Sequence, residues 1–367
     1  MTGVPERRSG PPWLLEEMIE AEAGLPRAVA ARTDDAAEIA RAVADAHERG
    51  ERIVVTGCGT SEHAAQGIAA LLAEQLGAAA VAARQALDAA SAPERGGVCI
   101  GVSHEGGTAA TVAALTAARA SGAGTVLVTA APTAPAAEQA DLVLATPLVD
   151  RSWCHTVGYV SPLLAGALVA AALAGQPFSA QDAERALAAA GERVGVSALA
   201  RSRRLLVAGS GVDEVTAREL ALKVAEGARL PSQALSLENV LHGHLVAEDA
   251  ESAVVVVVTG DASTLAARRA PQVLEAARRI GAATAALASA GIADELDAEL
   301  RLVLPDVPGA LGRLLGGAGA LQSLTVALVR ARGVNPDLLR REEPPYRSAA
   351  AAAEEGAASV YAVRGAE

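Results

Sequence analysis

The fold of this chain is decided by the stretch RIVVTGCGTS, residues 52–61. Its first half is a short β-branched run, which predicts a buried strand. Its glycines end that strand in a tight turn, and an alanine-rich helix is expected to follow to about Leu76. A strand that leads into a helix through a glycine turn opens a βαβ unit, so this stretch predicts a parallel sheet.

The same alternation of strand and helix recurs in both halves of the chain. Strands are expected at 79–83, 98–102, 124–129, 141–144, 205–208, 253–259, 284–287 and 302–304. Helices are expected at 13–32, broken at Pro26, and at 36–48, 109–120, 161–173 and 311–332. This pattern predicts an α/β chain with two tandem αβα sandwich domains, flavodoxin-like, with mainly parallel sheets. The expected divisions are an N-terminal segment and helix (1–33), a first domain (34–178), a second domain (179–334) and a C-terminal tail (335–367).

Composition excludes several classes of partner. The chain has 367 residues, a formal net charge of −12 and 2% aromatic residues, so nucleic acid, which needs basic and stacking side chains, is not an expected partner. The three cysteines are too widely spaced for a disulfide framework or a metal-ligand pair. No secretory leader is visible and the apolar runs are interrupted early, so we expect a cytoplasmic protein without a membrane partner.

Two glycine turns invite a dinucleotide-binding interpretation. Gly57-x-Gly59 and Gly209-x-Gly211 each follow an expected strand and open an expected helix, but Glu62 and Glu214 stand where the third glycine of that fingerprint belongs. A nucleotide-binding oxidoreductase is therefore disfavoured. Two interpretations stay open: a cradle for an anion or a polyol, with hydroxyls from Ser61, Ser103 and Thr108, or a simple set of helix caps.

The helix after the second turn carries three charged residues on one face. Glu219, Lys223 and Glu226 recur at i, i+4 and i+7, and His242 follows sixteen residues after Glu226. An acid, a base and a histidine have the parts for proton transfer. Spacing alone favours a plainer alternative, an exposed Glu219–Lys223 ion pair worth ~0.3–0.5 kcal/mol with Glu226 solvated beyond it.

These motifs resemble the SIS (sugar isomerase) family in its double-domain form, and most of all the isomerase half of the glucosamine-6-phosphate synthases. The family reads Cys-Gly-Thr-Ser in its first loop, as residues 58–61 do, and Ser-Gln-Ser-Gly-Glu-Thr in its second, where residues 103–108 stand. Its second domain has Ala-Leu-Lys-x-x-Glu and then His-Gly, matched by residues 221–226 and by 242–243 with the spacing kept.

The resemblance implies a role for each matching residue. Glu226 would move a proton between two carbons of an open-chain sugar, Lys223 would assist the cis-enediol intermediate, and His242 would help open the ring. In the family this histidine comes from the partner subunit, which implies a homodimer with a shared active site. No metal or organic cofactor is implied. The implied contacts to a sugar or sugar-phosphate substrate are Gly59, Thr60, Ser61, Ser103, His104, Glu105, Thr108, His155 and Thr156.

Departures from the family bear on the substrate. Glu105 replaces a phosphate-binding serine of the family, and a carboxylate ~4 Å from a phosphate would repel it by several kcal/mol in a partly dry site. Two interpretations stay open: Glu105 turns outward, or the substrate is not an ordinary sugar phosphate. The tail has no lysine for imine formation, and no cysteine lies near Met1, so glutamine-driven amination is not expected.

The expected function is thus a cofactor-free aldose–ketose isomerase of a sugar phosphate or of an amino or modified sugar. The alternatives are an amino-sugar-phosphate deaminase or deglycase and a non-catalytic, sugar-phosphate-binding regulatory module.

Overall fold

The computed structural model describes residues 7–188 and 195–361, so the first six residues of the expected N-terminal segment and the last six of the tail lie outside it. The chain divides into two compact units. Unit 1 contains Gly24–Ala180 and the described tail from Leu338. Unit 2 contains Arg7–Ala23 and the described residues of Gln181–Asp337.

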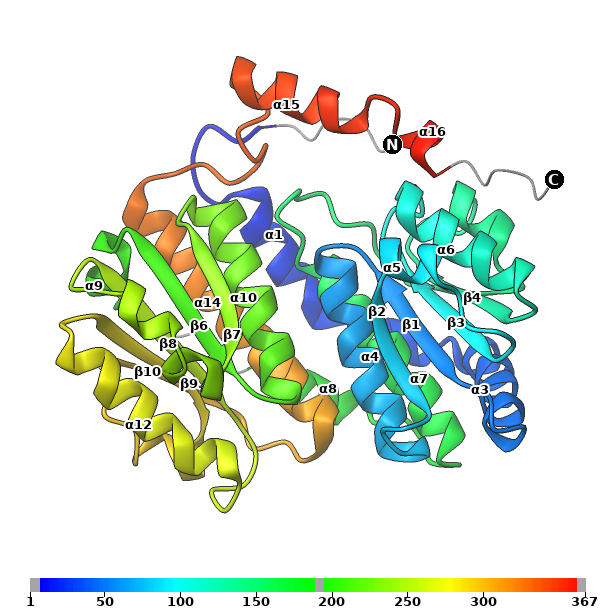
Figure 1. Ribbon diagram of the computed structural model, residues 1–367, viewed down its shortest axis with the longest axis horizontal. Helices are drawn as coiled ribbons and strands as arrows, with labels where there is room; N and C mark the ends of the chain where they lie inside the picture. The colour runs from blue at the N-terminus through cyan, green and yellow to red at the C-terminus, as the bar shows by residue number, and fades with distance from the viewer. Residues whose placement is uncertain (1–6, 189–194, 362–367) are drawn as a thin grey trace. The chain divides into compact units, whose positions relative to one another are not determined.

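Unit 1 is a three-layer α/β sandwich around a five-stranded sheet in the order β2-β1-β3-β4-β5 (Figure 1). Its strands are β1 (Ile53–Gly57), β2 (Val81–Gln85), β3 (Val98–Val102), β4 (Gly124–Thr129) and β5 (Leu142–Ala145). One face is covered by α3 (Thr33–Glu48), α4 (Thr60–Leu76) and α7 (Val157–Leu173), with α2 (Leu25–Ala30) against α7. The other face is covered by α5 (Ala86–Ser91), α6 (Ala109–Ala120) and η2 (Pro135–Gln139).

The central strands of unit 1 are buried on both faces. Every residue of β1 and β3 is buried, as expected for parallel strands that have helices on each side. Gly166 of α7 shows how closely the helices approach, since a Cβ there would lie 2.6 Å from Ile68 of α4. The scarcity of aromatic residues is therefore matched by close helix–helix packing.

Unit 2 repeats this architecture. Its sheet has the order β7-β6-β8-β9-β10, which is the order of unit 1 strand for strand, and every pairing of the described strands is parallel. Its strands are β6 (Arg204–Gly209), β7 (Ser232–Ser236), β8 (Ser252–Val258), β9 (Ala283–Ser289) and β10 (Leu300–Leu304). Its helices are α1 (Leu14–Ala21), η1 (Glu22–Gly24), α8 (Ala180–Leu187), α9 (Ser197–Arg201), α10 (Val212–Ala228), α11 (Leu237–Leu241), η4 (His244–Ala247), α12 (Leu265–Arg279), α13 (Ala290–Ala293) and α14 (Gly309–Arg332).

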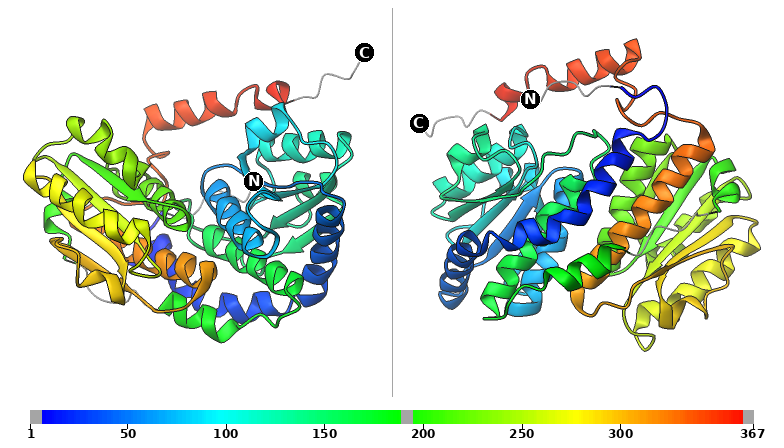
Figure 2. Two further views of the ribbon diagram at one scale, coloured as in Figure 1. Left: turned by 60° about the horizontal axis from the view of Figure 1, so that its bottom comes forward. Right: turned by 180° about the vertical axis from the view of Figure 1, so that it is seen from behind.

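Helix α14 is the core helix of unit 2. It packs along α10 and has α1 beside it, as the view from behind in Figure 2 shows. Among the described residues it is the one helix whose length and composition would allow it to span a membrane, yet 72% of its apolar window is buried inside the protein. That burial is what a central helix of a globular unit requires.

The fold class predicted from the sequence is confirmed, with local corrections. The break expected at Pro26 in the helical segment 13–32 lies slightly earlier: the segment forms α1, η1 and α2, with Pro26 in the first turn of α2. The expected strand at 79–83 lies at β2, two residues later, and β7 was missed because its polar residues lack an apolar run. The tail contains α15 (Pro344–Glu354) and α16 (Ala357–Val360), where the sequence analysis assigned no helix.

Candidate active site

The two glycine turns have the same backbone geometry. A Cβ on Gly57 would lie 2.6 Å from the carbonyl oxygen of Ser61, and a Cβ on Gly209 would lie 2.4 Å from that of Asp213. Gly59 and Gly211 have φ values of +58° and +61°, which only glycine adopts readily. Each turn therefore aims the N-terminus of a helix, α4 or α10, at the carboxyl edge of its sheet.

In unit 1 the predicted contact residues lie at this edge. Gly59 is exposed, and Thr60 and Ser61 are half-buried in the first turn of α4. Ser103 and His104 are buried directly after β3, Glu105 is half-buried beside them, and Thr108 is the exposed N-cap of α6.

His104 is held as a neutral imidazole. Its Nε2 atom accepts a hydrogen bond of 2.7 Å from the backbone N–H of Asp150, so the ring proton resides on Nδ1. Burial, followed by the nearby His155, lowers the pKa of His104 to about 4. The ring of His155 lies 5.3 Å away in an edge-to-face arrangement.

Asp150 organises the segment that carries His155 and Thr156. Its buried carboxylate accepts backbone hydrogen bonds from Ser152, Thr156 and Gly158 at 2.9, 2.7 and 3.1 Å. Burial raises the pKa of Asp150, although these donors favour its charged form. Sequence reasoning missed Asp150; the signal was an aspartate seven residues before the start of an apolar helix.

Several buried polar atoms at this edge have no hydrogen-bond partner in the described part of the chain. Leaving such an atom unsatisfied costs about 1–3 kcal/mol. Ordered water, or a ligand that reached these buried atoms, would satisfy them. They are Thr56 Oγ1, Ser103 Oγ, His104 Nδ1, Thr146 Oγ1, Thr156 Oγ1 and Ser161 Oγ.

In unit 2 a buried aspartate side chain occupies the corresponding turn. Asp213 occupies the position of Ser61 and is 1% exposed. Its carboxylate accepts hydrogen bonds from the backbone N–H of Thr259, at 2.9 Å, and from the Thr259 hydroxyl. The guanidinium of Arg313 on α14 lies 3.1 Å from the same carboxylate. This cluster was not foreseen, although an aspartate directly inside a glycine turn could have pointed to it.

Helix α10 carries the predicted proton-transfer residues. The Lys223 Nζ atom lies 2.5 Å from Glu226 Oε2 and 3.6 Å from Glu219 Oε1. Lys223 is 1% exposed and Glu219 is fully buried, whereas the Glu226 side chain is 24% exposed. The plainer alternative of a solvent-exposed ion pair is therefore wrong, and the carboxylate that water can still reach is Glu226.

His242 lies on the surface of unit 2, just after α11. Its side chain is 67% exposed, and Nε2 is 2.9 Å from Glu238 Oε1. Arg269 of α12 holds the same carboxylate with two hydrogen bonds of 2.9 Å. Within its own unit, His242 is thus held by a surface carboxylate rather than buried in a pocket.

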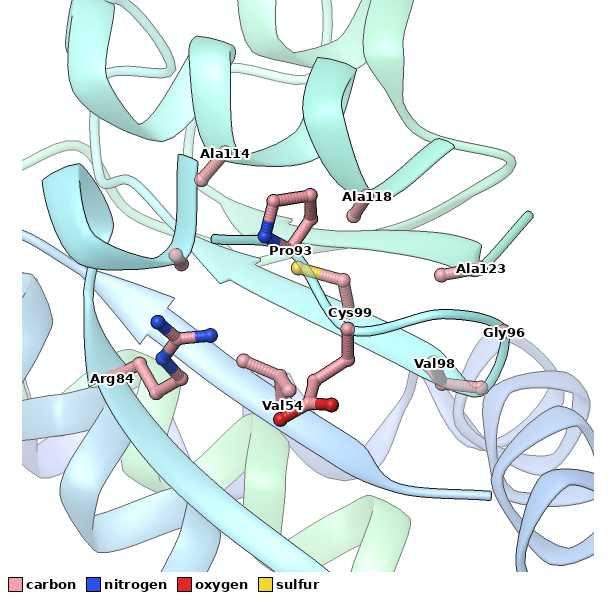
Figure 3. Close-up of a pocket in the computed structure, with 11 residues that line it drawn as sticks. Val54, Arg84, Pro93, Gly96, Val98, Cys99, Ala114, Ala118 and Ala123 are labelled. Carbon is pink, nitrogen blue, oxygen red and sulfur yellow. The ribbon is translucent and has the colours of Figure 1, made fainter. Parts of the chain in front are cut away.

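A small hollow in unit 1 is separate from these groups. It is lined by β1, β3 and α6 together with Pro93, and Figure 3 shows the Cys99 thiol facing it. Its lining includes Gly96 and Ala123, which precede strands, so it lies toward the amino ends of the sheet. A volume of about 10 Å³ holds at most one water, so no sugar fits there.

Comparison with known proteins identifies a domain family for part of unit 1. Residues 47–174 match the family model of the SIS domain. No curated protein matches the chain.

Solved structures similar to the chain have the same fold. The C-terminal domain of glucosamine-fructose-6-phosphate aminotransferase from Francisella tularensis aligns with a TM-score of 0.75 at 17% identity, over 90% of this chain and 99% of that one. Tagatose-6-phosphate ketose/aldose isomerase from Escherichia coli aligns with a TM-score of 0.72 at 22% identity, over 92% of this chain and 97% of that one. Glucosamine-6-phosphate deaminase from Thermotoga maritima aligns with a TM-score of 0.60 at 17% identity, over 85% of this chain and 95% of that one.

Proposed function

We propose that this chain is a cofactor-free aldose–ketose isomerase of a sugar phosphate or of an amino or modified sugar. The observation that carries the proposal is the contact of 2.5 Å between the buried Lys223 ammonium and the partly exposed Glu226 carboxylate. A carboxylate beside a cation, with access from solvent, can act first as a base and then as an acid. The SIS match and the isomerase and deaminase among the similar structures support this choice.

In the proposed reaction, Glu226 removes the proton from C2 of the open-chain aldose. The electrons form the C1–C2 double bond of a cis-enediol, and O1 takes up a proton. The same carboxylate then returns its proton to C1 while O2 loses one. Atoms and electrons balance without a co-reactant. Lys223 stabilises the negative charge that develops on the sugar oxygens.

The contacts to the sugar are proposed to come from unit 1. Its unsatisfied buried polar atoms supply donors and acceptors of the kind a polyol needs. We assign substrate binding to Gly59, Thr60, Ser61, Ser103, His104, Glu105, Thr108, His155 and Thr156. Unit 2 would then be a second SIS domain that carries the acid–base pair, and the enzyme would act in the cytoplasm.

The proposal also includes a homodimer in which His242 serves the Glu226 of another copy. The exposure of His242 within its own unit supports this role. Mixing Glu226→Gln with His242→Asn chains tests it, because each mixed dimer would regain one intact site. About a quarter of the wild-type activity should return on subunit exchange, and no recovery would show that the two residues act within one chain.

The main test is exchange of the substrate C1 and C2 hydrogens with D2O, followed by NMR with tagatose 6-phosphate, fructose 6-phosphate and glucosamine 6-phosphate. Glu226→Gln should lower the rate by about 10²–10⁴-fold, the usual contribution of a general base. Glu214→Gln is the matched control, since it lies on the same helix and pairs with Arg218 on the surface. Unchanged exchange in Glu226→Gln would disprove the role, and release of ammonia would identify a deaminase.

A further inference from the structure

The loop between β3 and α6 carries a negative charge next to a buried histidine. Glu105 is half-buried, and its carboxylate acts electrostatically on the ring of His104. The loop is rigid at this point. The His104 carbonyl accepts hydrogen bonds from the Thr129 hydroxyl, at 3.1 Å, and from the Ala130 N–H, at 3.0 Å. The backbone that carries Glu105 is therefore held in place beside His104.

His104 can donate a hydrogen bond to a group bound at this loop, but the ring carries no charge. Its Nε2 atom is engaged by the Asp150 N–H, and its Nδ1–H has no partner in the described residues although His104 is only 6% exposed. The other titratable groups facing the ring are His155 and Asp150, and the carboxylate of Asp150 accepts backbone N–H groups. The ring thus supplies one neutral donor to the loop.

Unit 2 shows how this fold accommodates an anion at the same edge. There the carboxylate of Asp213 fills the glycine turn, and it receives two hydrogen bonds from Thr259 and an ion pair with Arg313. In unit 1 the loop instead contributes a carboxylate of its own. A bound phosphate would add negative charge beside Glu105, whereas a hydroxyl or an ammonium group would donate a hydrogen bond to it.

We propose that the 103–108 loop binds a hydroxyl or ammonium group of the sugar, and not its phosphate. Glu105 accepts a hydrogen bond from that group, and the Nδ1–H of His104 donates to a neighbouring sugar oxygen. The inference rests on the proposed sugar-binding function of unit 1. It makes position 105 a determinant of substrate class, with amino sugars preferred over phosphorylated ones.

Equilibrium binding tests this without requiring catalysis. Calorimetric titration of the full chain with glucose, glucosamine, glucose 6-phosphate and inorganic phosphate is compared for wild type, Glu105→Gln and Glu105→Ser. Wild type should bind glucosamine at least 10-fold more tightly than glucose 6-phosphate, and should not bind phosphate. Glu105→Ser should reverse the order of the two sugars and gain phosphate binding. Glu48→Gln, an equal charge change at the exposed end of α3, should leave the order unchanged.

Three results would overturn the inference: tighter binding of glucose 6-phosphate by wild type, an order that does not respond to position 105, or no binding of any of the four probes. The outcomes remain separable from those of the proposed function. Preserved binding preferences with no hydrogen exchange would remove only the isomerase assignment. Exchange with a phosphate preference independent of Glu105 would remove only this inference.

Discussion

The glycine turns of the two units have the same backbone geometry but carry different side chains. In unit 1 the turn presents Ser61, and buried polar atoms around the sheet edge have no hydrogen-bond partner among the described residues. In unit 2 the turn contains Asp213, whose carboxylate is satisfied by Thr259 and Arg313. The same backbone thus surrounds unpartnered buried polar atoms in the described part of unit 1 and an internal ion pair in unit 2.

The difference between the two turns lies in their side chains and not in the backbone that they share. Strand order and turn geometry are common to both units, so they cannot distinguish a binding edge from a closed one. The distinction depends on a few side chains at the strand ends. Among the described residues of β6–α14, no buried side-chain polar atom lacks a partner, in contrast with the edge of unit 1.

The largest expected effect is at Asp213. Replacing Asp213 with alanine leaves the guanidinium of Arg313 without its buried partner, and breaking a buried pair typically costs about 3–5 kcal/mol. Because the Arg313 side chain is 30% exposed, the loss should lie near the lower end of that range. Urea denaturation should show this loss. The double variant Asp213→Ala/Arg313→Met should recover most of it, because no unpaired charge remains. Equal stability of the single and double variants would mean that the pair does not hold the closed edge together.

The titration of His104 should have a smaller effect on folding stability. Its pKa is about 4 in the folded protein and near 6.5 when unfolded, so between these values the unfolded chain binds more protons. Stability should therefore fall as the pH falls from 6.5 to 4, by at most roughly 3 kcal/mol. Asp150, whose pKa is raised, acts in the opposite direction. His104→Gln should flatten the pH dependence, and an unchanged slope would contradict the buried neutral state.

The shared backbone can be tested with one substitution in each unit. The Cβ of Gly57→Ala would lie 2.6 Å from a helix carbonyl oxygen, and that of Gly209→Ala 2.4 Å from the corresponding oxygen. Each variant should therefore lose about 1–3 kcal/mol of folding stability. Similar losses in thermal unfolding would confirm that the turns are equivalent. A loss confined to one unit would show that the other relaxes.

The smallest effect should come from Ser61→Ala. Ser61 is half-buried and lies in the open edge, so its removal should change stability by less than about 0.5 kcal/mol. Comparing the stability losses of Ser61→Ala and Asp213→Ala then shows how much more the turn of unit 2 depends on its side chain. A loss as large as that of Asp213→Ala would mean that Ser61 also serves as a structural clamp.

Much of the fold could be predicted from the sequence, because β-branched runs and glycine turns have local signatures. The strand at Ile53–Gly57 and the helix at Ala109–Ala120 lie where these signals place them. Strand β7 could not be found in this way. Its residues Ser232–Ser236 form an edge strand with one neighbour, and such a strand needs no continuous apolar run.

The candidate site was predictable only where a motif marked it. Lys223 and Glu226 were identified by spacing and resemblance, but their burial depends on the packing of α14 against α10. Asp150 and Arg313 were missed because their roles arise from contacts between segments far apart in sequence, 46 residues from His104 and 100 from Asp213. Local patterns carry no information about such pairings.

The burial of Lys223 has a practical consequence, since it is the single lysine of the sequence. A lysine-selective reagent can modify its ε-amine only when α10 opens away from its packing. The rate of that modification therefore reports how often α10 is released, and a bound ligand that holds α10 in place should slow it.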